Sequence, residues 1–247
     1  MSAGLTVVKL GGSLLADPER LRARLRRLAV GADGPCLIVP GGGPFADAVR
    51  TAQAALGFDD RLAHRLALDA MGQMAEVFLD LEPRLALVST LPPPPSAGEG
   101  TPRSRRGRDE VPQKGSDDAG KRSSLHEGCA SSVRVAPLSR PGLTAGPPSP
   151  VEGGGRAALV WNPSSLRAGH PDIPETWDVT SDSLALWLAR DVGAAACILV
   201  KSAAPPPGTG PADWARHGLV DAAFPTFAAR YRGSIRIEGP AQGRVAA

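Results

Sequence analysis

Two apolar segments, each followed at once by glycines, constrain the fold of this chain most strongly. The sequence VVKLGGS spans residues 7–13, and IVPGGG spans residues 38–43. Between them, Asp17 and Pro18 supply a helix-capping residue and a proline at the first helical position. The interval holds one helix, and parallel strands need a crossover of about this length. The sequence therefore predicts a parallel α/β sheet.

The rest of the chain continues the alternation of strands and helices. We expect strands at residues 5–10, 36–39, 85–90, 157–161, 196–200 and 234–237. We expect helices from Pro18, from near Pro44, over residues 61–81, over residues 182–191 with Ser181 or Thr180 as the cap, and near residues 224–231. The third helix is apolar around most of its circumference, which predicts that it lies inside the protein, and its apolar residues include Leu62, Leu66, Met71, Met74, Val77 and Phe78.

Residues 92–155 differ in composition from the rest of the chain. They begin with four prolines, are rich in Pro, Gly and Ser, and contain no aromatic residue. Such a segment buries too little apolar surface to fold, so we predict a disordered insertion in a single domain of residues 1–247. Its arginine cluster, at Arg103, Arg105, Arg106 and Arg108, is more typical of a solvated linker than of a docking site for an anionic partner.

Charge and cysteine content exclude several classes of protein. Outside residues 92–155 the chain has 19 Lys and Arg against 18 Asp and Glu, which argues against a basic nucleic-acid-binding face. Cys36, Cys129 and Cys197 are scattered and odd in number, so we expect neither a disulfide framework nor a metal site, and a reducing compartment. The N-terminus lacks a signal-peptide pattern, and no apolar run could span a bilayer, so we expect a cytoplasmic protein without a membrane partner.

The glycine turns and nearby charges predict a site that handles phosphate. Glycine lets backbone N–H groups approach bound oxygens closely, and phosphoryl transfer depends on positioning and charge neutralisation. Lys9 stands at the carboxyl end of a strand, where α/β folds bind ligands, and Lys201 follows another strand. Asp182 is placed to orient both lysines and to hold Mg²⁺ through water.

Each of these features also has a purely structural interpretation. Tight turns need glycine with or without a ligand, and Ser-Asp at the start of a helix is often only a cap. Lys201 is as consistent with a solvated strand-end charge as with a catalytic role. The combination of two glycine turns with a capped acidic helix in one chain favours function.

The motifs VKLGGS, PGGG and the later SD at a helix start resemble the amino-acid kinase superfamily. That resemblance implies a three-layer α/β/α sandwich with a central, mainly parallel sheet, phosphotransferase activity, and ATP and Mg²⁺ as cofactors. Residues 38–50, 64–78 and 177–186 further resemble the archaeal kinases that phosphorylate an aminomethylfuran methyl phosphate in methanofuran biosynthesis. This closer resemblance implies transfer of the γ-phosphate of ATP to a substrate phosphate.

The resemblance also assigns roles to individual residues. It implies catalytic roles for Lys9, Asp182 and Lys201, and binding of the transferring phosphate or nucleotide by Gly11, Gly12, Ser13, Ser181 and Ser183. It implies contacts with the acceptor by Gly41, Gly42, Gly43, Arg61, His64 and Asp69. A buried Asp69 needs a positive partner, either the aminomethyl group of the substrate or a neighbouring Arg65 or Arg61. For His64, an ordinary packed histidine is the alternative.

One region departs from the superfamily pattern. After the strand at residues 196–200 the chain reads KSAAPPPG, where related kinases have an aspartate- and glycine-containing turn that contacts the nucleotide. The altered turn therefore leaves open a non-catalytic nucleotide- or oxyanion-binding relative. Kinases of the same fold that act on a carboxylate, a nucleoside monophosphate or an isoprenoid monophosphate also stay open, because only the acceptor pocket separates them. The partners we expect are a small phosphorylated substrate and further copies of the chain in a homo-oligomer, without nucleic acid.

Overall fold

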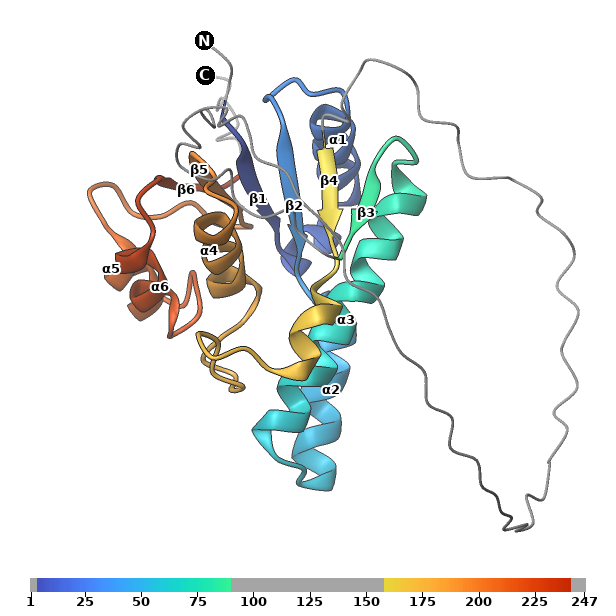
Figure 1. The fold of residues 1–247 in the computed structure, drawn as a ribbon, viewed down its shortest axis with the longest axis vertical. Helices are drawn as coiled ribbons and strands as arrows, with labels where there is room; N and C mark the ends of the chain where they lie inside the picture. Colours follow the sequence, from blue (N-terminus) through green and yellow to red (C-terminus); the bar gives the residue numbers. More distant parts are fainter. Residues whose placement is uncertain (1–3, 90–157, 241–247) are drawn as a thin grey trace, which may run out of the picture. The chain divides into compact units, whose positions relative to one another are not determined.

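Six parallel strands form the central sheet of the computed structural model, which describes residues 4–89 and 158–240. Their order across the sheet is β3-β4-β2-β1-β5-β6 (Figure 1). The strands are β1 (Thr6–Leu10), β2 (Cys36–Pro40), β3 (Ala86–Val88), β4 (Ala158–Trp161), β5 (Ala196–Val200) and β6 (Ser234–Glu238). β3 pairs with β4, so strands from before and after residues 92–155 share one sheet.

Helices connect these strands and cover both faces of the sheet (Figure 1). The α-helices are α1 (Pro18–Ala29), α2 (Gly43–Leu56), α3 (Asp60–Leu81), α4 (Ser181–Asp191), α5 (Pro211–Arg216) and α6 (Phe224–Arg230). Two 3₁₀ helices, η1 (Gly12–Ala16) and η2 (Pro163–Ala168), follow β1 and β4 directly. The prediction of a three-layer α/β/α sandwich with a mainly parallel sheet is confirmed, and every strand pairing in the described ranges is parallel.

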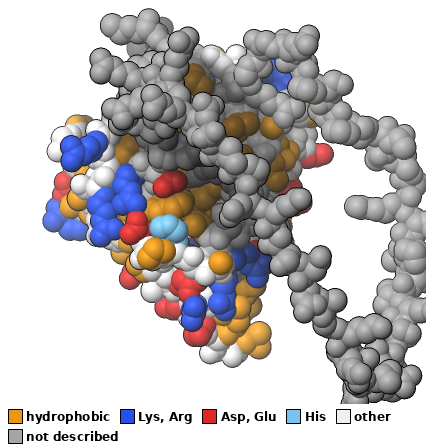
Figure 2. All heavy atoms as spheres, viewed as in Figure 1, with side chains coloured by type: hydrophobic (Ala, Val, Ile, Leu, Met, Phe, Trp, Pro, Cys, Tyr) orange, Lys and Arg blue, Asp and Glu red, His pale blue; other side chains and the backbone are white. Residues whose placement is uncertain are grey.

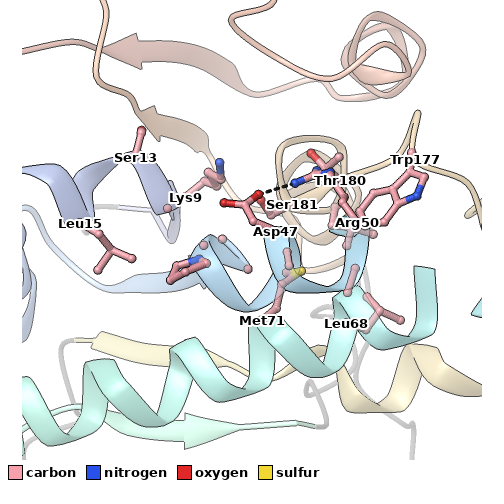
Figure 3. Close-up of a pocket in the computed structure, with 18 of the residues that line it drawn as sticks. Lys9, Ser13, Leu15, Asp47, Arg50, Leu68, Met71, Trp177, Thr180 and Ser181 are labelled. Carbon is pink, nitrogen blue, oxygen red and sulfur yellow. Dashed lines mark hydrogen bonds and ion pairs between the residues drawn. The ribbon is translucent and has the colours of Figure 1, made fainter. Parts of the chain in front are cut away.

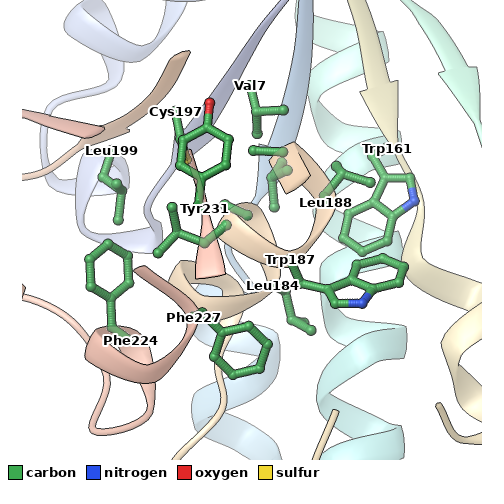
Figure 4. Close-up of a cluster of buried hydrophobic side chains, with 14 of the residues drawn as sticks. Val7, Trp161, Leu184, Trp187, Leu188, Cys197, Leu199, Phe224, Phe227 and Tyr231 are labelled. Carbon is green, nitrogen blue, oxygen red and sulfur yellow. The ribbon is translucent and has the colours of Figure 1, made fainter. Parts of the chain in front are cut away.

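Alternate residues of β1 point into two different hydrophobic clusters, as the two-residue period of a strand requires. Val7 belongs to the cluster under α4 and α6, which Figure 4 shows with Trp161, Leu188, Phe224 and Tyr231. Val8 belongs to the cluster on the opposite face, where Leu21, Leu25 and Leu28 of α1 and Met74 and Phe78 of α3 are buried. The sheet is therefore covered on both faces, as parallel sheets are.

Most predicted strands and helices exist within one or two residues of their expected bounds. Asp17 caps α1 as expected, because its carboxylate accepts a hydrogen bond of 3.1 Å from the backbone of Arg20. β3 is shorter than predicted, and the end of that prediction at Thr90, like the whole prediction for residues 92–155, lies outside the described residues. The short helices η1, η2 and α5 were not predicted from the sequence.

The prediction that α3 is buried on most sides is only partly correct. Met71, Met74 and Phe78 are buried, but Leu62 is 37% exposed and Leu66 and Val77 are only half-buried. Figure 1 shows the reason: the first half of α3 lies beside α2 beyond the ends of the strands, and only its second half covers the sheet. Leu62 is therefore not covered by the sheet.

The surface of the described residues carries both signs of charge. On the face in Figure 2, basic and acidic side chains lie among one another rather than in a patch of one sign. Cys36 and Cys197, in the part of the chain that the structure describes, are buried free thiols, and burial raises their pKa to about 11 and about 12. Among residues 4–89 and 158–240, no helix is long and apolar enough to cross a membrane.

Candidate active site

The two glycine turns lie against each other at the carboxyl ends of β1 and β2. These strands are neighbours, with Leu10 opposite Pro40, and the N–H of Gly41 donates to the carbonyl of Leu10 at 2.8 Å. A Cβ on Gly12 would lie 2.5 Å from the Cα of Gly43, and a Cβ on Gly41 would lie 2.9 Å from the backbone nitrogen of Gly12. The backbones therefore approach more closely than any side chain would allow.

The same turns begin two helices. Gly12 starts η1, and Gly43, with a φ of +52°, starts α2. No side chain caps α2, whose first residues line a cavity. The first amides of a helix lack partners within the helix and attract anions. The turns thus combine close backbone packing with a place suited to phosphate.

Asp182 lies between the two lysines at the adjacent strand ends. Its Oδ1 is 2.7 Å from the ammonium of Lys9, and its Oδ2 is 2.5 Å from that of Lys201. Lys9 and Asp182 are only 5% and 4% exposed. The three residues come from β1, the end of β5 and the first turn of α4, so the fold brings together the predicted catalytic residues. Two ammonium groups and one carboxylate leave a net positive charge beside the glycine turns.

Burial and the neighbouring charges shift the pKa values of this cluster. Burial lowers the pKa of Lys201 to about 8, with a further lowering by Lys9, while Asp182 opposes both. Burial disfavours the charged form of Asp182, but Lys9 and Lys201 outweigh it and bring the pKa of this carboxyl below its ordinary value. Asp182 is therefore a stable carboxylate, and Lys201 is the group whose charge changes near neutral pH.

Asp221 joins this region although the sequence analysis did not select it. Its carboxylate accepts hydrogen bonds from the backbone and side chain of Thr180 and of Ser183 at the start of α4. Thr180 is the N-cap residue, but its side chain caps nothing and instead donates to Asp221 at 2.8 Å. Thr180 is thus at the N-cap position, as predicted, but the side chain that accepts from the first amides is that of Asp221, 41 positions further along the chain.

A cavity of about 680 Å³ opens beside the glycine turns. Figure 3 shows Lys9 and Ser13 at one end and Arg50 and Trp177 at the other. Leu68 and Met71 of α3 contribute apolar wall between them. Of the predicted site residues, those that line this cavity are Lys9, Gly12, Ser13, Gly41, Gly42, Gly43, His64 and Ser181.

The end of the cavity away from Lys9 carries a guanidinium and an indole. Arg50 lies over the ring of Trp177 at 4.4 Å from its centroid, and its Nη1 donates to Asp47 at 2.8 Å (Figure 3). The indole Nε1 of Trp177 donates to Gln53 at 2.6 Å. Sequence reasoning missed these residues, although Asp47, Arg50 and Gln53 recur every three residues on one face of α2.

His64 is buried on the wall of the cavity. Its Nδ1 lies 3.3 Å from the carbonyl of Thr176, so this nitrogen carries the proton if it bonds there, and Nε2 is left as an acceptor. Burial lowers the pKa of His64 despite the opposing effects of that carbonyl and of Glu175. A neutral imidazole is thus favoured at this wall, which fits a hydrogen-bonding role better than a charged one.

Several predicted site residues do not face the cavity. Asp69 is half-buried rather than buried and pairs with Arg167 at 3.2 Å, because η2 packs along α3 at this point. Arg61 is exposed and pairs with Glu175 at 2.6 Å. Ser183 is fully buried and bonded to Asp221, and Gly11, Asp182 and Lys201 are likewise not among the residues that line the cavity.

The residues do not form a resident magnesium site. Within the described ranges, no group of three or more His, Cys, Asp or Glu side chains could hold a metal ion. Both oxygens of Asp182 already face ammonium groups, whose charge repels a cation. A Mg²⁺ ion would therefore have to be held mainly by the phosphates of a bound nucleotide, as is common for this metal.

A protein-family model matches the part of the chain that contains the glycine turns. Residues 4–105 match the model of the amino acid kinase family. The sequence motifs predicted this match. A segment of 75 residues is 37% identical to the [5-(aminomethyl)furan-3-yl]methyl phosphate kinase of Methanocaldococcus jannaschii. The segment covers 30% of this chain and 35% of that relative, so the chain spans about a third of the relative's length.

A solved structure is similar in fold to almost the whole chain. The UMP kinase from Bacillus anthracis is 14% identical, with a TM-score of 0.52 over 98% of this chain and 90% of that one. The uridylate kinase from Archaeoglobus fulgidus is also 14% identical, with a TM-score of 0.48 over 95% of this chain and 91% of that one. The likeness to the first structure supports the fold of the amino acid kinase family.

Proposed function

We propose that this protein is an ATP-dependent small-molecule kinase that transfers a phosphoryl group to the phosphate of a small acceptor. The observation that carries the proposal is the Lys9–Asp182–Lys201 cluster at the carboxyl edge of the sheet, beside two glycine turns and an open cavity. The family match of residues 4–105 supports kinase activity. Folds of this class bind ligands at this edge of the sheet.

The geometry suits charge stabilisation during transfer. An oxygen of the acceptor phosphate attacks the γ-phosphorus of ATP, the bond to the β-phosphate oxygen breaks, and ADP leaves. Negative charge spreads over the transferring group, and Lys9 with the amides of the glycine turns would lie against it. Asp182 holds the ammonium groups in place, so little reorganisation accompanies the reaction. Magnesium would supply further neutralisation through the phosphates of the nucleotide.

For the acceptor, we propose an aminomethylfuran methyl phosphate. The 37% identity over 75 residues with the Methanocaldococcus jannaschii enzyme supports this choice. The acceptor phosphate would lie near Gly42 and Gly43, and the ring would reach the end formed by Arg50 and Trp177. The planar guanidinium of Arg50, stacked on the indole of Trp177, suits packing against a planar ring. Because Asp47 lines the cavity and Asp69 does not, we assign the contact with the ammonium group to Asp47.

Acceptor-dependent release of ADP by the full chain tests the proposal. ATP and Mg²⁺ are supplied with an aminomethylfuran methyl phosphate, a nucleoside monophosphate, an isoprenoid monophosphate or a carboxylate. We expect the furan phosphate to give the highest kcat/KM, and Lys9→Ala to lower turnover by roughly two orders of magnitude. ADP release that no acceptor stimulates would contradict kinase activity, whereas preference for another phosphate would change only the acceptor.

A further inference from the structure

Asp221 lies between α5 and α6 and directs its carboxylate at the first turn of α4. Its Oδ2 accepts from the backbone nitrogens of Thr180 at 2.9 Å and Ser183 at 3.0 Å, and from the hydroxyl of Thr180 at 2.8 Å. Its Oδ1 accepts from the hydroxyl of Ser183. One carboxylate thus takes four donors from two residues of α4 and its cap. Carboxylates at a helix N-terminus are favoured by the free amides and by the helix dipole.

A second contact ties the same two segments together. The backbone nitrogen of Ala223 donates to the carbonyl of Asp178 at 2.9 Å, just before α4 begins. Phe224 and Phe227 of α6 are buried in the same hydrophobic cluster as Leu184 of α4 (Figure 4). The start of α4 is therefore held by the segment that follows α5 rather than by a cap of its own.

Asp182 lies on the turn that Asp221 holds, between Thr180 and Ser183. Its two ion pairs are 2.7 and 2.5 Å long, so a shift of the first turn of α4 would lengthen and weaken them. We propose that Asp221 is a positioning residue, which fixes the first turn of α4 and thereby holds the carboxylate of Asp182 between Lys9 and Lys201. Its importance for turnover rests on the proposed kinase function, whereas the positioning is a property of the folded chain.

The charges around Asp221 make the positioning measurable. Burial raises the pKa of Asp221, the hydrogen bonds from Ser183 lower it, and the charge of Asp182 raises it. Asp182 and Asp221 both raise the pKa of Lys201, against burial and Lys9, which lower it to about 8. Loss of Asp221 therefore lowers the pKa of Lys201 in two ways: it removes one negative charge, and it loosens the contact with Asp182.

Competitive acetylation of Lys201 tests the proposal without any substrate. The full chain and its Asp221→Asn variant are labelled with trace acetic anhydride from pH 6 to 10, and the label on Lys201 is quantified by mass spectrometry. We expect a midpoint near pH 8 in the unmodified chain and a midpoint lower by roughly one pH unit in the variant. Asp213→Asn is the matched control, because the carboxylate of Asp213 accepts from Gly210 and pairs with Arg216, both at α5, rather than with the start of α4. Its midpoint should stay unchanged.

Kinetics with the accepted substrate give the second readout. Asp221→Asn should lower kcat roughly ten-fold or more with little change in the KM of the acceptor, and Asp213→Asn should change neither. A folded Asp221→Asn variant with an unchanged midpoint or an unchanged kcat would overturn the proposal, as would a midpoint that rises toward that of an exposed lysine. Where Asp221→Asn does not fold, Ser183→Ala removes one donor and should shift the midpoint less, in the same direction. Absence of transfer in the unmodified chain would remove the kinase function and leave the labelling test valid.

Discussion

The two sides of the candidate active site are built by different physical means. On one side, the glycine turns at residues 11–13 and 41–43 meet through backbone contacts too short for any side chain. On the other side is the charge cluster of Lys9, Asp182, Lys201 and Asp221, which side chains from four separate parts of the chain assemble. Such close backbone contacts can be recognised in the sequence, because only glycine fits them. The long-range contacts of Asp221 cannot be recognised in this way from the residues around it, although those of Asp182 with the two lysines were expected from the sequence.

The match to the family model covers the glycine turns but only one residue of the charge cluster. The family match ends at residue 105, so it includes both glycine turns and Lys9 but not α4, β5 or Asp221. The segment after β5 also lacks the turn that the superfamily resemblance implies. The charge cluster is nevertheless complete in the structure, with Lys201 reaching Asp182 from the end of β5. Variation after β5 therefore need not remove the charges to which we assign the proposed transfer.

The largest expected effect is that of Asp182→Asn. The change leaves two buried ammonium groups without their carboxylate, which costs about 3–5 kcal/mol when a buried pair is broken. We also expect turnover to fall roughly 10²- to 10³-fold, because the lysines lose their fixed positions. Chemical denaturation and single-turnover kinetics on the same sample measure both effects. A variant with normal turnover would show that the charge cluster is structural only.

Gly12→Ala tests the glycine side of the comparison. The new Cβ meets backbone rather than a flexible side chain, at 2.5 Å from the Cα of Gly43, so we expect a loss of about 3 kcal/mol. Gly57→Ala is the control, because Gly57 has a φ of +73° but nothing within 4 Å of its Cβ position. Left-handed strain alone costs about 1–2 kcal/mol. Equal urea midpoints for the two variants would contradict the close packing of the turns.

The fold was largely predictable because its signals are local. Residues 196–200 are a buried apolar run that forms β5 with the expected bounds, and Asp17 caps α1 within three residues of its own position. The apolar pattern of α3 predicted more burial than the helix has, because the pattern alone does not show that its first half lies beyond the sheet. Short helices such as α5 give too few turns for a periodic signal.

The site was predictable where a residue's role is tied to its neighbours in sequence. Lys9 and the first glycine turn belong to one short motif, and the second glycine turn belongs to another. Asp182 lies in the first turn of a helix. Asp221 was missed because its partners are 38 and 41 residues away. Asp69 was chosen because a carboxylate on an apolar helix needs a partner, but sequence does not reveal that η2 brings Arg167 to it. Long-range pairs of this kind require the structure.

The pH dependence of turnover distinguishes a working Lys201 from a structural one. Its pKa of about 8 means that the positive charge is lost as pH rises through that value, so kcat should fall about ten-fold per pH unit above it. Lys201→Arg keeps its charge, so the fall of kcat should begin at a higher pH in this variant. The stability effect has the opposite sign: between about pH 8 and 10.5 the unfolded chain binds more protons at Lys201, so the free energy of unfolding rises there. A fall that begins at the same pH in Lys201→Arg would exclude Lys201 from the reaction.

Arg50→Ala and Arg61→Ala form a matched pair for the acceptor end. Both arginines are paired with a carboxylate, but Arg50 lines the cavity and Arg61 does not. We expect Arg50→Ala to raise the KM of the acceptor roughly ten-fold, which corresponds to about 1.4 kcal/mol, with unchanged KM for ATP. Arg61→Ala should leave both constants near those of the unmodified chain. The opposite result would place the acceptor on the outer surface of α3.

Asp69→Asn should have the smallest effect, and it tests the correction to the sequence-based site. Asp69 and Arg167 are 35% and 52% exposed in their side chains, and water screens such a pair, so its loss should change the free energy of unfolding by less than about 1 kcal/mol. Because Asp69 lies outside the cavity lining, acceptor KM and kcat should not change. Asp47→Asn is the contrasting variant, since Asp47 lines the cavity and orients Arg50. Should Asp69→Asn impair acceptor use more than Asp47→Asn does, the acceptor would have to contact η2, and the cavity beside the glycine turns would hold only the nucleotide phosphates.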